Sequence, residues 1–157
     1  MPSESVVQAE DKMNEWRSLK SMGEQLSQEE RARYARHLIL PEMGEEGQKK
    51  LKKSSVIVIG AGGLGSPTLL YLAAAGVGKI GIIDDDRVDI TNLQRQVIHS
   101  TAAVGSLKVE SAANRIRELN PEIEIVEHNI RLDISNALEL LSDWDVVIDG
   151  TDNFPTR

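Results

Sequence analysis

A glycine-rich stretch at residues 60–65, Gly-Ala-Gly-Gly-Leu-Gly, is the clearest candidate for chemistry in the sequence. Its spacing is G-x-G-x-x-G, and it stands between an expected strand and an expected helix. Glycines in this pattern allow a tight turn, a close approach of backbone to phosphate, and close packing of helix on strand. The helix that follows offers unpaired N–H groups and the positive end of its dipole to an anion. The pattern therefore predicts a nucleotide phosphate site at Gly60, Gly62, Gly63, Leu64 and Gly65.

An acidic residue supports this interpretation. Asp84 stands 19 residues after Gly65, at the end of the second expected strand. A carboxylate in that place can accept hydrogen bonds from ribose hydroxyls. These residues predict a bound nucleotide, but they leave NAD and ATP open.

Four polar clusters bear on the choice between hydride transfer and ATP chemistry. They are residues 92–96, 105–109, 149–153 and 33–37. An enzyme that breaks the α–β bond of ATP needs fixed cations, because charge builds on the departing pyrophosphate. Arg95, Lys108 and Arg36 are the candidate cations, and Asp152 is the candidate Mg²⁺ ligand, since Mg²⁺ prefers oxygen donors.

Each candidate also has a purely structural interpretation. Arg95 can be a solvated loop residue, and Lys108 and Arg36 can lie on exposed helix faces. Asp152 can cap a following helix. Asp85, Asp86 and Asp89 can form a solvated acidic loop, in which Asp86 is the candidate for function. The three histidines lack metal-ligand spacing and are interpreted as structural.

Composition and charge exclude several classes of protein. The 157 residues suit about one domain, and with 3% aromatic residues its core must be aliphatic. The absence of cysteine excludes a disulfide framework, a thiolate zinc site and a cysteine nucleophile within this chain. No apolar run is long enough to span a membrane, and no secretory signal precedes the domain, so a cytoplasmic protein is expected. Residues 55–157 hold 8 basic and 15 acidic residues, which argues against nucleic acid as a partner.

The order of expected elements is β-α-β-α-β-α-β. Strands are expected at 56–59, 79–84, 123–127 and 145–148, and helices after the glycine loop to residue 75, over 109–119 and over 135–142. This order predicts an α/β, Rossmann-like fold, with a mostly parallel sheet and helices on both faces.

Short helices are expected before the first strand. Ser27 and Glu30 have the spacing of a capping box, which predicts a helix over 28–38, and a second helix is expected over 44–52. Residues 1–26 are expected to be an extension that is poorly ordered or forms a short helix near Met13, Trp16 and Leu19. The nucleotide-binding domain is therefore expected to cover 27–157.

Taken together, several motifs resemble one family. Arg33–Pro41, Gly60–Gly65, Ala74–Gly78, Asn92–Gln96 and Thr151–Asn153 are similar to the MoeB/ThiF adenylyltransferases of the ubiquitin-activating-type superfamily. The resemblance implies Mg·ATP and a ubiquitin-fold sulfur carrier that ends in Gly-Gly. The carrier's terminal carboxylate attacks the α-phosphate and releases pyrophosphate, in molybdopterin, thiamin or tRNA-thiolation pathways.

The resemblance also implies roles for single residues. Arg36 would reach ATP in the opposite subunit of a homodimer, Asp84 would hold ribose, and Asp152 would bind Mg²⁺. The triphosphate would be lined by Asp86, Asn92, Arg95 and Lys108.

Family members usually continue well beyond the position of Arg157, so the chain is expected to be truncated relative to them. A cysteine zinc site is expected only in that further part. The alternatives are an NAD(P)-binding dehydrogenase domain and a non-catalytic nucleotide-binding fragment.

Overall fold

The computed structural model describes residues 25–151, in two units that divide between residues 49 and 50. The extension predicted for residues 1–26, with its possible helix near Met13, lies outside the described residues except for Gln25 and Leu26. The boundary predicted at residue 27 stays a prediction.

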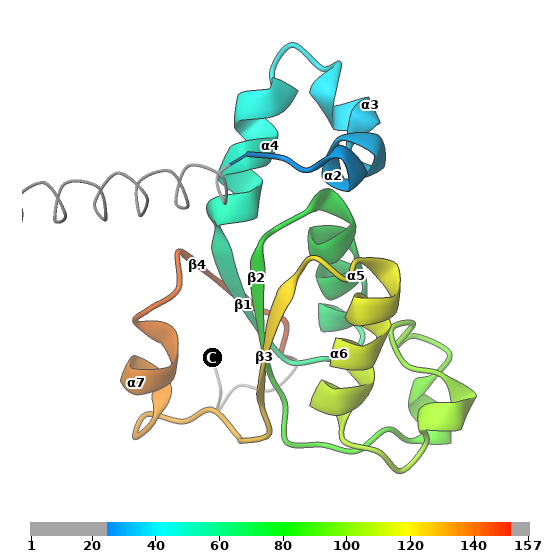
Figure 1. Cartoon of the computed structure of the whole chain (residues 1–157). Coiled ribbons are helices and arrows are strands. Elements are labelled where there is room, and N and C mark those ends of the chain that lie inside the picture. The colour runs from blue at the N-terminus through cyan, green and yellow to red at the C-terminus, as the bar shows by residue number, and fades with distance from the viewer. Residues whose placement is uncertain (1–24, 152–157) are drawn as a thin grey trace, which may run out of the picture. The chain divides into compact units, whose positions relative to one another are not determined.

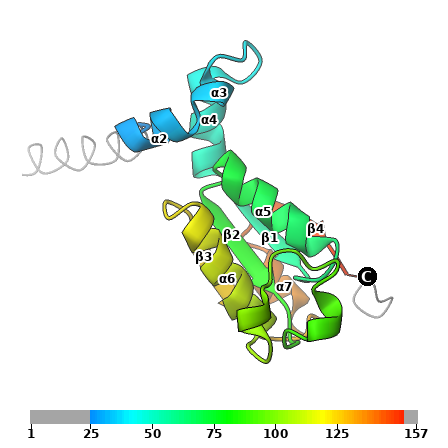
Figure 2. The same cartoon turned by 90° about the vertical axis from the view of Figure 1, so that its right-hand side faces the viewer.

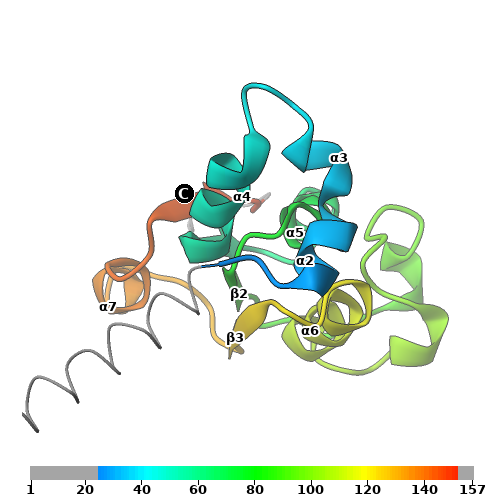
Figure 3. The ribbon, with the colours of Figure 1, turned by 45° about the horizontal axis from the view of Figure 1, so that its top comes forward.

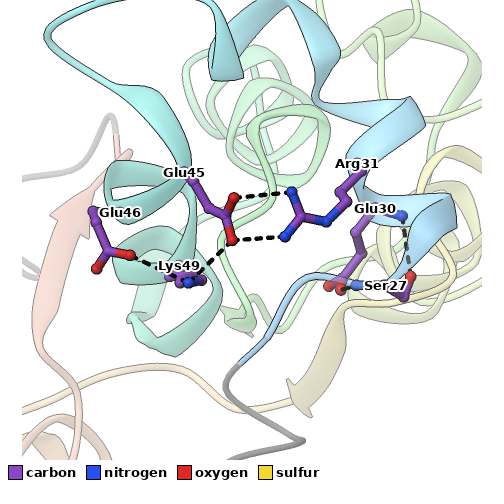
Figure 4. Close-up of polar contacts among 6 residues, drawn as sticks. All are labelled: Ser27, Glu30, Arg31, Glu45, Glu46 and Lys49. Atoms are coloured by element: carbon purple, nitrogen blue, oxygen red, sulfur yellow. Dashed lines mark hydrogen bonds and ion pairs between the residues drawn. The ribbon is translucent and has the colours of Figure 1, made fainter.

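The N-terminal unit contains α2 (Gln28–Arg33), α3 (Ala35–Leu38) and the first part of α4 (Gly44–Lys53). The predicted capping box is confirmed at the start of α2. The Ser27 hydroxyl accepts from the Glu30 N–H at 3.1 Å, and the Glu30 carboxylate accepts from the Ser27 N–H at 2.7 Å (Figure 4). These two bonds satisfy donors that the helix itself leaves open.

An ion-pair group ties α2 to α4. The Arg31 guanidinium donates to both carboxylate oxygens of Glu45, at 2.7 and 2.9 Å, and the Lys49 ammonium lies 3.1 Å from the same carboxylate (Figure 4). The hydrogen bonds from Arg31, followed by those from Lys49, lower the pKa of Glu45 to about 2. Glu45 therefore stays ionised at any pH near neutrality.

The single helix predicted over 28–38 is wrong in one respect, because the chain turns at Tyr34. Its φ and ψ of −100° and 16° lie outside the helical range and separate α2 from α3. The Tyr34 side chain is buried and stacks on the His37 ring, with centroids 6.1 Å apart. The break therefore coincides with a buried ring, a tertiary feature that helical periodicity does not show.

The second unit is built on four parallel strands in the order β3-β2-β1-β4 (Figure 1). The strands are β1 (Ser55–Ile59), β2 (Lys79–Ile83), β3 (Glu124–His128) and β4 (Val146–Asp149). In β1 and β2 every residue after the first is buried, as continuous β-branched runs predict for strands covered on both faces. The predicted parallel α/β sheet is thus confirmed.

Helices cover both faces of this sheet, as predicted. Helices α5 (Gly65–Ala75) and α6 (Lys108–Leu119) lie side by side on one face, and α7 (Ala137–Leu141) lies on the other (Figures 1, 2 and 3). Side chains alternate along β1, so Val56 and Val58 pack toward α5 and α6 while Ile57 and Ile59 pack toward α7. Two aliphatic cores result.

Several predicted element bounds differ from the observed ones by one or two residues. β1 and α6 begin one residue earlier than predicted, β2 ends one residue earlier, and α4 ends one residue later. β3 begins and ends one residue later than predicted, and α7 is shorter, covering 137–141. β4 also begins one residue later, at Val146, because the Asp145 carboxylate accepts from the N–H and hydroxyl of Ser55 at 2.8 and 2.9 Å. Asp145 thereby fixes the start of β4 against the start of β1.

The connection predicted over 85–104 contains two single turns, η1 (Ile90–Asn92) and η2 (Thr101–Ala103). Among residues 25–151 no helix combines the length and the apolar character needed to cross a bilayer.

Replacing Gly65 by alanine should destabilise the second unit, because a Cβ there would lie 1.8 Å from the Gly60 carbonyl oxygen. Strand and helix would have to separate, at a cost of about 2 kcal/mol or more. Gly63→Ala is the matched control, since a Cβ there would meet an Arg95 side-chain carbon at an ordinary 3.6 Å. Urea unfolding midpoints of the two variants measure the difference, and equal midpoints would contradict the assigned contact.

Candidate functional site

The glycine-rich loop lies where β1 and β4 end next to each other. Gly60 adopts φ +93°, which favours glycine, and Gly65 approaches its carbonyl as described above. Gly150, directly after β4, also lies close to the loop, since a Cβ on it would stand 3.3 Å from the Gly65 nitrogen. The strand order reverses between β1 and β4, and such switch points are where open α/β sheets bind ligands.

Two side chains hold Ala61, the second residue of this loop. The Ala61 N–H donates to the Asp84 carboxylate at 2.8 Å, and the Ala61 carbonyl lies 2.8 Å from His99 Nε2. A carbonyl can only accept, so Nε2 carries the proton and Nδ1 accepts from the Ser111 hydroxyl, also at 2.8 Å. His99 is thus structural, as predicted from the sequence.

This arrangement directs the backbone of the loop. The carbonyl and the N–H of one peptide unit point in opposite directions, so the bond from His99 to Ala61 turns the Gly62 N–H away from His99. Within the described part of the chain, the N–H groups from Gly62 to Gly65 donate to no acceptor. These N–H groups lie at the start of α5, and the positive end of the helix dipole adds to their attraction for an anion.

A cleft of about 740 Å³ opens beside the loop. It is lined by the loop, by the residues that follow β2, β3 and β4, and by the polar connection after β2. Its polar lining includes Asp84, Asp86, Arg87, Asn92, Arg95, Gln96, Lys108, Arg131 and Thr151.

The cleft gathers the cations of an acidic unit. Four of the seven basic residues between positions 55 and 151 line it. They are Arg87, Arg95, Lys108 and Arg131. The same lining holds the carboxylates of Asp84, Asp85 and Asp86. The cations outnumber them in a unit that is otherwise strongly acidic, which favours an anionic ligand in this cleft.

Lys108 is the most buried of these cations. Its side chain is 7% exposed, and its ammonium lies 3.0 Å from the Asp86 carboxylate, which is 68% exposed. The Lys108 N–H also donates to the Asp86 carbonyl at 2.9 Å. The interpretation of Lys108 as a helix-surface residue is wrong, because the side chain is buried and lines the cleft.

Arg95 lies across the loop. Its aliphatic carbons come within 3.6 Å of the place where a Cβ of Gly63 would stand, and its guanidinium donates weakly to the Thr91 carbonyl at 3.4 Å. The side chain is exposed to the cleft, with donors left for a ligand. Asn92 lies one turn earlier and lines the same cleft.

Asp84 and its neighbours form the acidic side. The two carboxylate oxygens of Asp84 accept from the N–H groups of Ala61 and Asp86, at 2.8 and 2.9 Å. Lone pairs remain on both oxygens for ribose hydroxyls, so the predicted ribose contact stays a prediction. Oxygens of Asp84, Asp85 and Asp86 lie within 4.8 Å of one another.

Two predicted site residues are not placed in the cleft. Arg36 is an exposed residue of α3 in the N-terminal unit, and its role stays a prediction. Asp152 lies outside the described residues.

Arg87, Gln96, Arg131 and Thr151 line the cleft but were not predicted as site residues. Arg87, Arg131 and Thr151 follow the carboxyl ends of β2, β3 and β4, and this position is the signal that could have identified them.

Comparison with known proteins identifies the family. The ThiF family model matches residues 34–157, so the chain belongs to the ThiF family. It is 61% identical over 132 residues to the probable adenylyltransferase/sulfurtransferase MoeZ of Mycobacterium tuberculosis, covering 84% of this chain and 34% of that protein. It is 51% identical over 131 residues to a probable molybdopterin-synthase adenylyltransferase of Porphyra purpurea, covering 83% and 34%. The chain thus spans about a third of the length of these curated relatives.

Solved structures confirm the fold. E. coli tRNA N6-threonylcarbamoyladenosine dehydratase, TcdA, in complex with ATP, matches with a TM-score of 0.79 and 32% identity over 83% of this chain and 54% of that one. E. coli MccB, in a structure with AMPCPP and MccA, matches with a TM-score of 0.70 and 32% identity, covering 78% and 38%.

His99 should make stability depend on pH. Burial lowers the pKa of His99, so the native state takes up a proton less readily than the unfolded chain. Its contribution is complete above the ordinary histidine pKa of about 6.5 and is lost as pH falls toward the lowered native value. Between pH 7.5 and pH 5 the free energy of unfolding should therefore fall more steeply in the wild type than in His99→Leu. Urea titrations at several pH values test this, and parallel curves would contradict it.

Proposed function

We propose that this protein is an ATP-dependent adenylyltransferase. Its substrate would be the C-terminal Gly-Gly carboxylate of a ubiquitin-fold sulfur carrier, and its products an acyl-adenylate and pyrophosphate. The observation that carries the proposal is the cleft itself, in which unpaired loop N–H groups stand beside Lys108 and Arg95 within an acidic unit. The names of the relatives and the ATP complex of TcdA support it.

The reaction is a displacement at the α-phosphorus. A carboxylate oxygen of the carrier forms a bond to that phosphorus, and the bond to the β-phosphate oxygen breaks, with its electron pair leaving on pyrophosphate. No covalent link to the protein is needed, so positioning in line and stabilisation of the departing charge account for the rate.

The described residues can supply both effects. The loop N–H groups would hold the phosphates against the start of α5. Lys108, oriented by Asp86, and Arg95, laid along the loop, would neutralise the pyrophosphate. Asp84 would hold the ribose, and Asn92 would line the phosphate chain.

Mg²⁺ fits the chemistry of this cleft, since the carboxylates of Asp84, Asp85 and Asp86 offer the oxygen ligands that it prefers. Asp152 remains the predicted principal ligand. When bound, Mg²⁺ would supply positive charge that offsets the charge of the phosphates. The zinc site concerns a segment beyond this chain and stays a prediction.

A homodimer completes the proposal. Arg36 would reach the phosphates bound by the partner subunit and add a further cation to the site. A cytoplasmic location remains part of the same prediction.

Replacing Lys108 by methionine should weaken ATP binding roughly 10-fold or more, because a buried cation beside the phosphates is lost. The protein should remain folded, since its partner Asp86 is exposed enough to be hydrated. Lys79→Met is the matched control, as Lys79 lies at the opposite end of β2. Calorimetric titrations with Mg·ATP and with NADH measure the effect. Tighter binding of NADH than of Mg·ATP would favour the dehydrogenase alternative.

Arg95→Ala should reduce carrier-dependent exchange of labelled pyrophosphate into ATP by roughly 100-fold, with a smaller effect on ATP binding. Exchange should fall more than ATP binding because the negative charge that Arg95 would neutralise is greatest on the departing pyrophosphate. Arg115→Ala, an exposed arginine of α6, is the control. Unchanged exchange in Arg95→Ala would refute the assigned role, and ATP binding without any exchange would support the non-catalytic alternative.

A further inference from the structure

Gln96 is a buried polar residue to which the reaction described above assigns no part. Its side chain lines the cleft, and the residue is 5% exposed. The carbonyl oxygen Oε1 is buried and accepts no hydrogen bond. Within the described part of the chain, the amide nitrogen Nε2 makes no hydrogen bond either. Buried amides are normally paired, so an unpaired one next to a cleft calls for a ligand.

A second glutamine in the same connection shows the usual arrangement. Gln94 is exposed, and its amide donates to the Thr91 carbonyl at 3.3 Å. It does not line the cleft. The two glutamines therefore share residue type and local chain but differ in burial and pairing.

The amide of Gln96 faces the space that Gly62 leaves empty. Its Nε2 lies 3.6 Å from the place where a Cβ on Gly62 would stand. The Ser66 N–H donates to the Gly62 carbonyl at 2.9 Å, and the Ser66 hydroxyl is fully buried without a partner. The Gln96 amide and the Gly62 N–H are therefore both unpaired at the same part of the loop.

A group seated over Gly62 would meet two donors, the Gly62 N–H and Gln96 Nε2. Two converging donors next to a helix N-terminus select an anionic oxygen. We propose that Gln96 is a further ligand contact of the cleft and donates from Nε2 to a phosphate oxygen of the nucleotide seated over Gly62. This inference rests on the proposed nucleotide function and adds a specific residue to it.

The test compares Gln96→Met with Gln94→Met in the whole chain, using ADP and adenosine as ligands in calorimetric or NMR titrations. Gln96→Met keeps the length of the side chain and removes its polar atoms. ADP binding should weaken roughly 10-fold, the loss expected for one hydrogen bond to a charged group, while adenosine binding should change less than about 2-fold. The melting temperature should stay the same or rise, because a buried unpaired amide is removed.

A charged variant sharpens the comparison. Gln96→Glu keeps the shape but places a carboxylate against the phosphate, so it should weaken ADP binding more than Gln96→Met does. Gln94→Met should leave both ligands unaffected.

Each other outcome has a distinct meaning. If Gln96→Met binds ADP as tightly as the wild type, the proposed contact is wrong. If it loses ADP and adenosine equally, Gln96 shapes the cleft without contacting phosphate, and the proposal is again overturned. A wild-type chain that binds neither ligand refutes the nucleotide function itself, on which this inference depends.

Discussion

The peptide backbone at Ala61 is held between a carboxylate and an imidazole. These two contacts set the direction in which the N–H groups of the glycine-rich loop face the cleft. Asp84 accepts from the Ala61 N–H, and His99 donates to the Ala61 carbonyl. Both bonds are buried or half-buried, so water competes weakly for them. They fix the direction of the following peptide units, whose N–H groups remain available to a ligand. The same carboxylate also accepts from the Asp86 N–H, and the Asp86 carboxylate pairs with Lys108, so loop and cation are positioned through one short chain of contacts.

The few cations of the second unit can direct an anionic ligand to one place because the unit as a whole is acidic. In a basic protein, an arginine near a phosphate site would be one of many cations, so its position would not indicate a binding site. Here most of the remaining surface repels anions, so a phosphate chain is attracted to one place. Lys108 contributes most directly, because its ammonium is held away from bulk water and its charge is screened less than that of an exposed lysine. Its pairing with Asp86 keeps that charge in place at little cost, since Asp86 retains most of its hydration.

Local signals predicted the strands, the glycine loop and the capping box, because β-branched runs, glycine spacing and the Ser27–Glu30 pair act over a few residues. The details that sequence could not provide depend on distant partners. The start of β4 depends on a bond between Asp145 and Ser55, which are 90 residues apart. His99 could be interpreted as structural, but its contacts with Ala61 and Ser111 lie 38 and 12 residues away. The burial of Gln96, within a motif otherwise noticed for its arginine, has no sequence signature at all.

The unpaired groups around Gly62 show how the fold and the site are related energetically. A chain selected for stability alone would pair or replace a buried amide, a buried hydroxyl and several loop N–H groups, because each unpaired polar group opposes folding. The second unit can carry them because β1 and β2 are buried on both faces and supply the apolar contacts that hold the sheet. A ligand that accepts from the loop N–H groups and from Gln96 Nε2 recovers part of what the free protein forgoes, so binding should also stabilise the fold. The unpaired donors of the glycine-rich loop therefore distinguish a binding site from a purely structural turn.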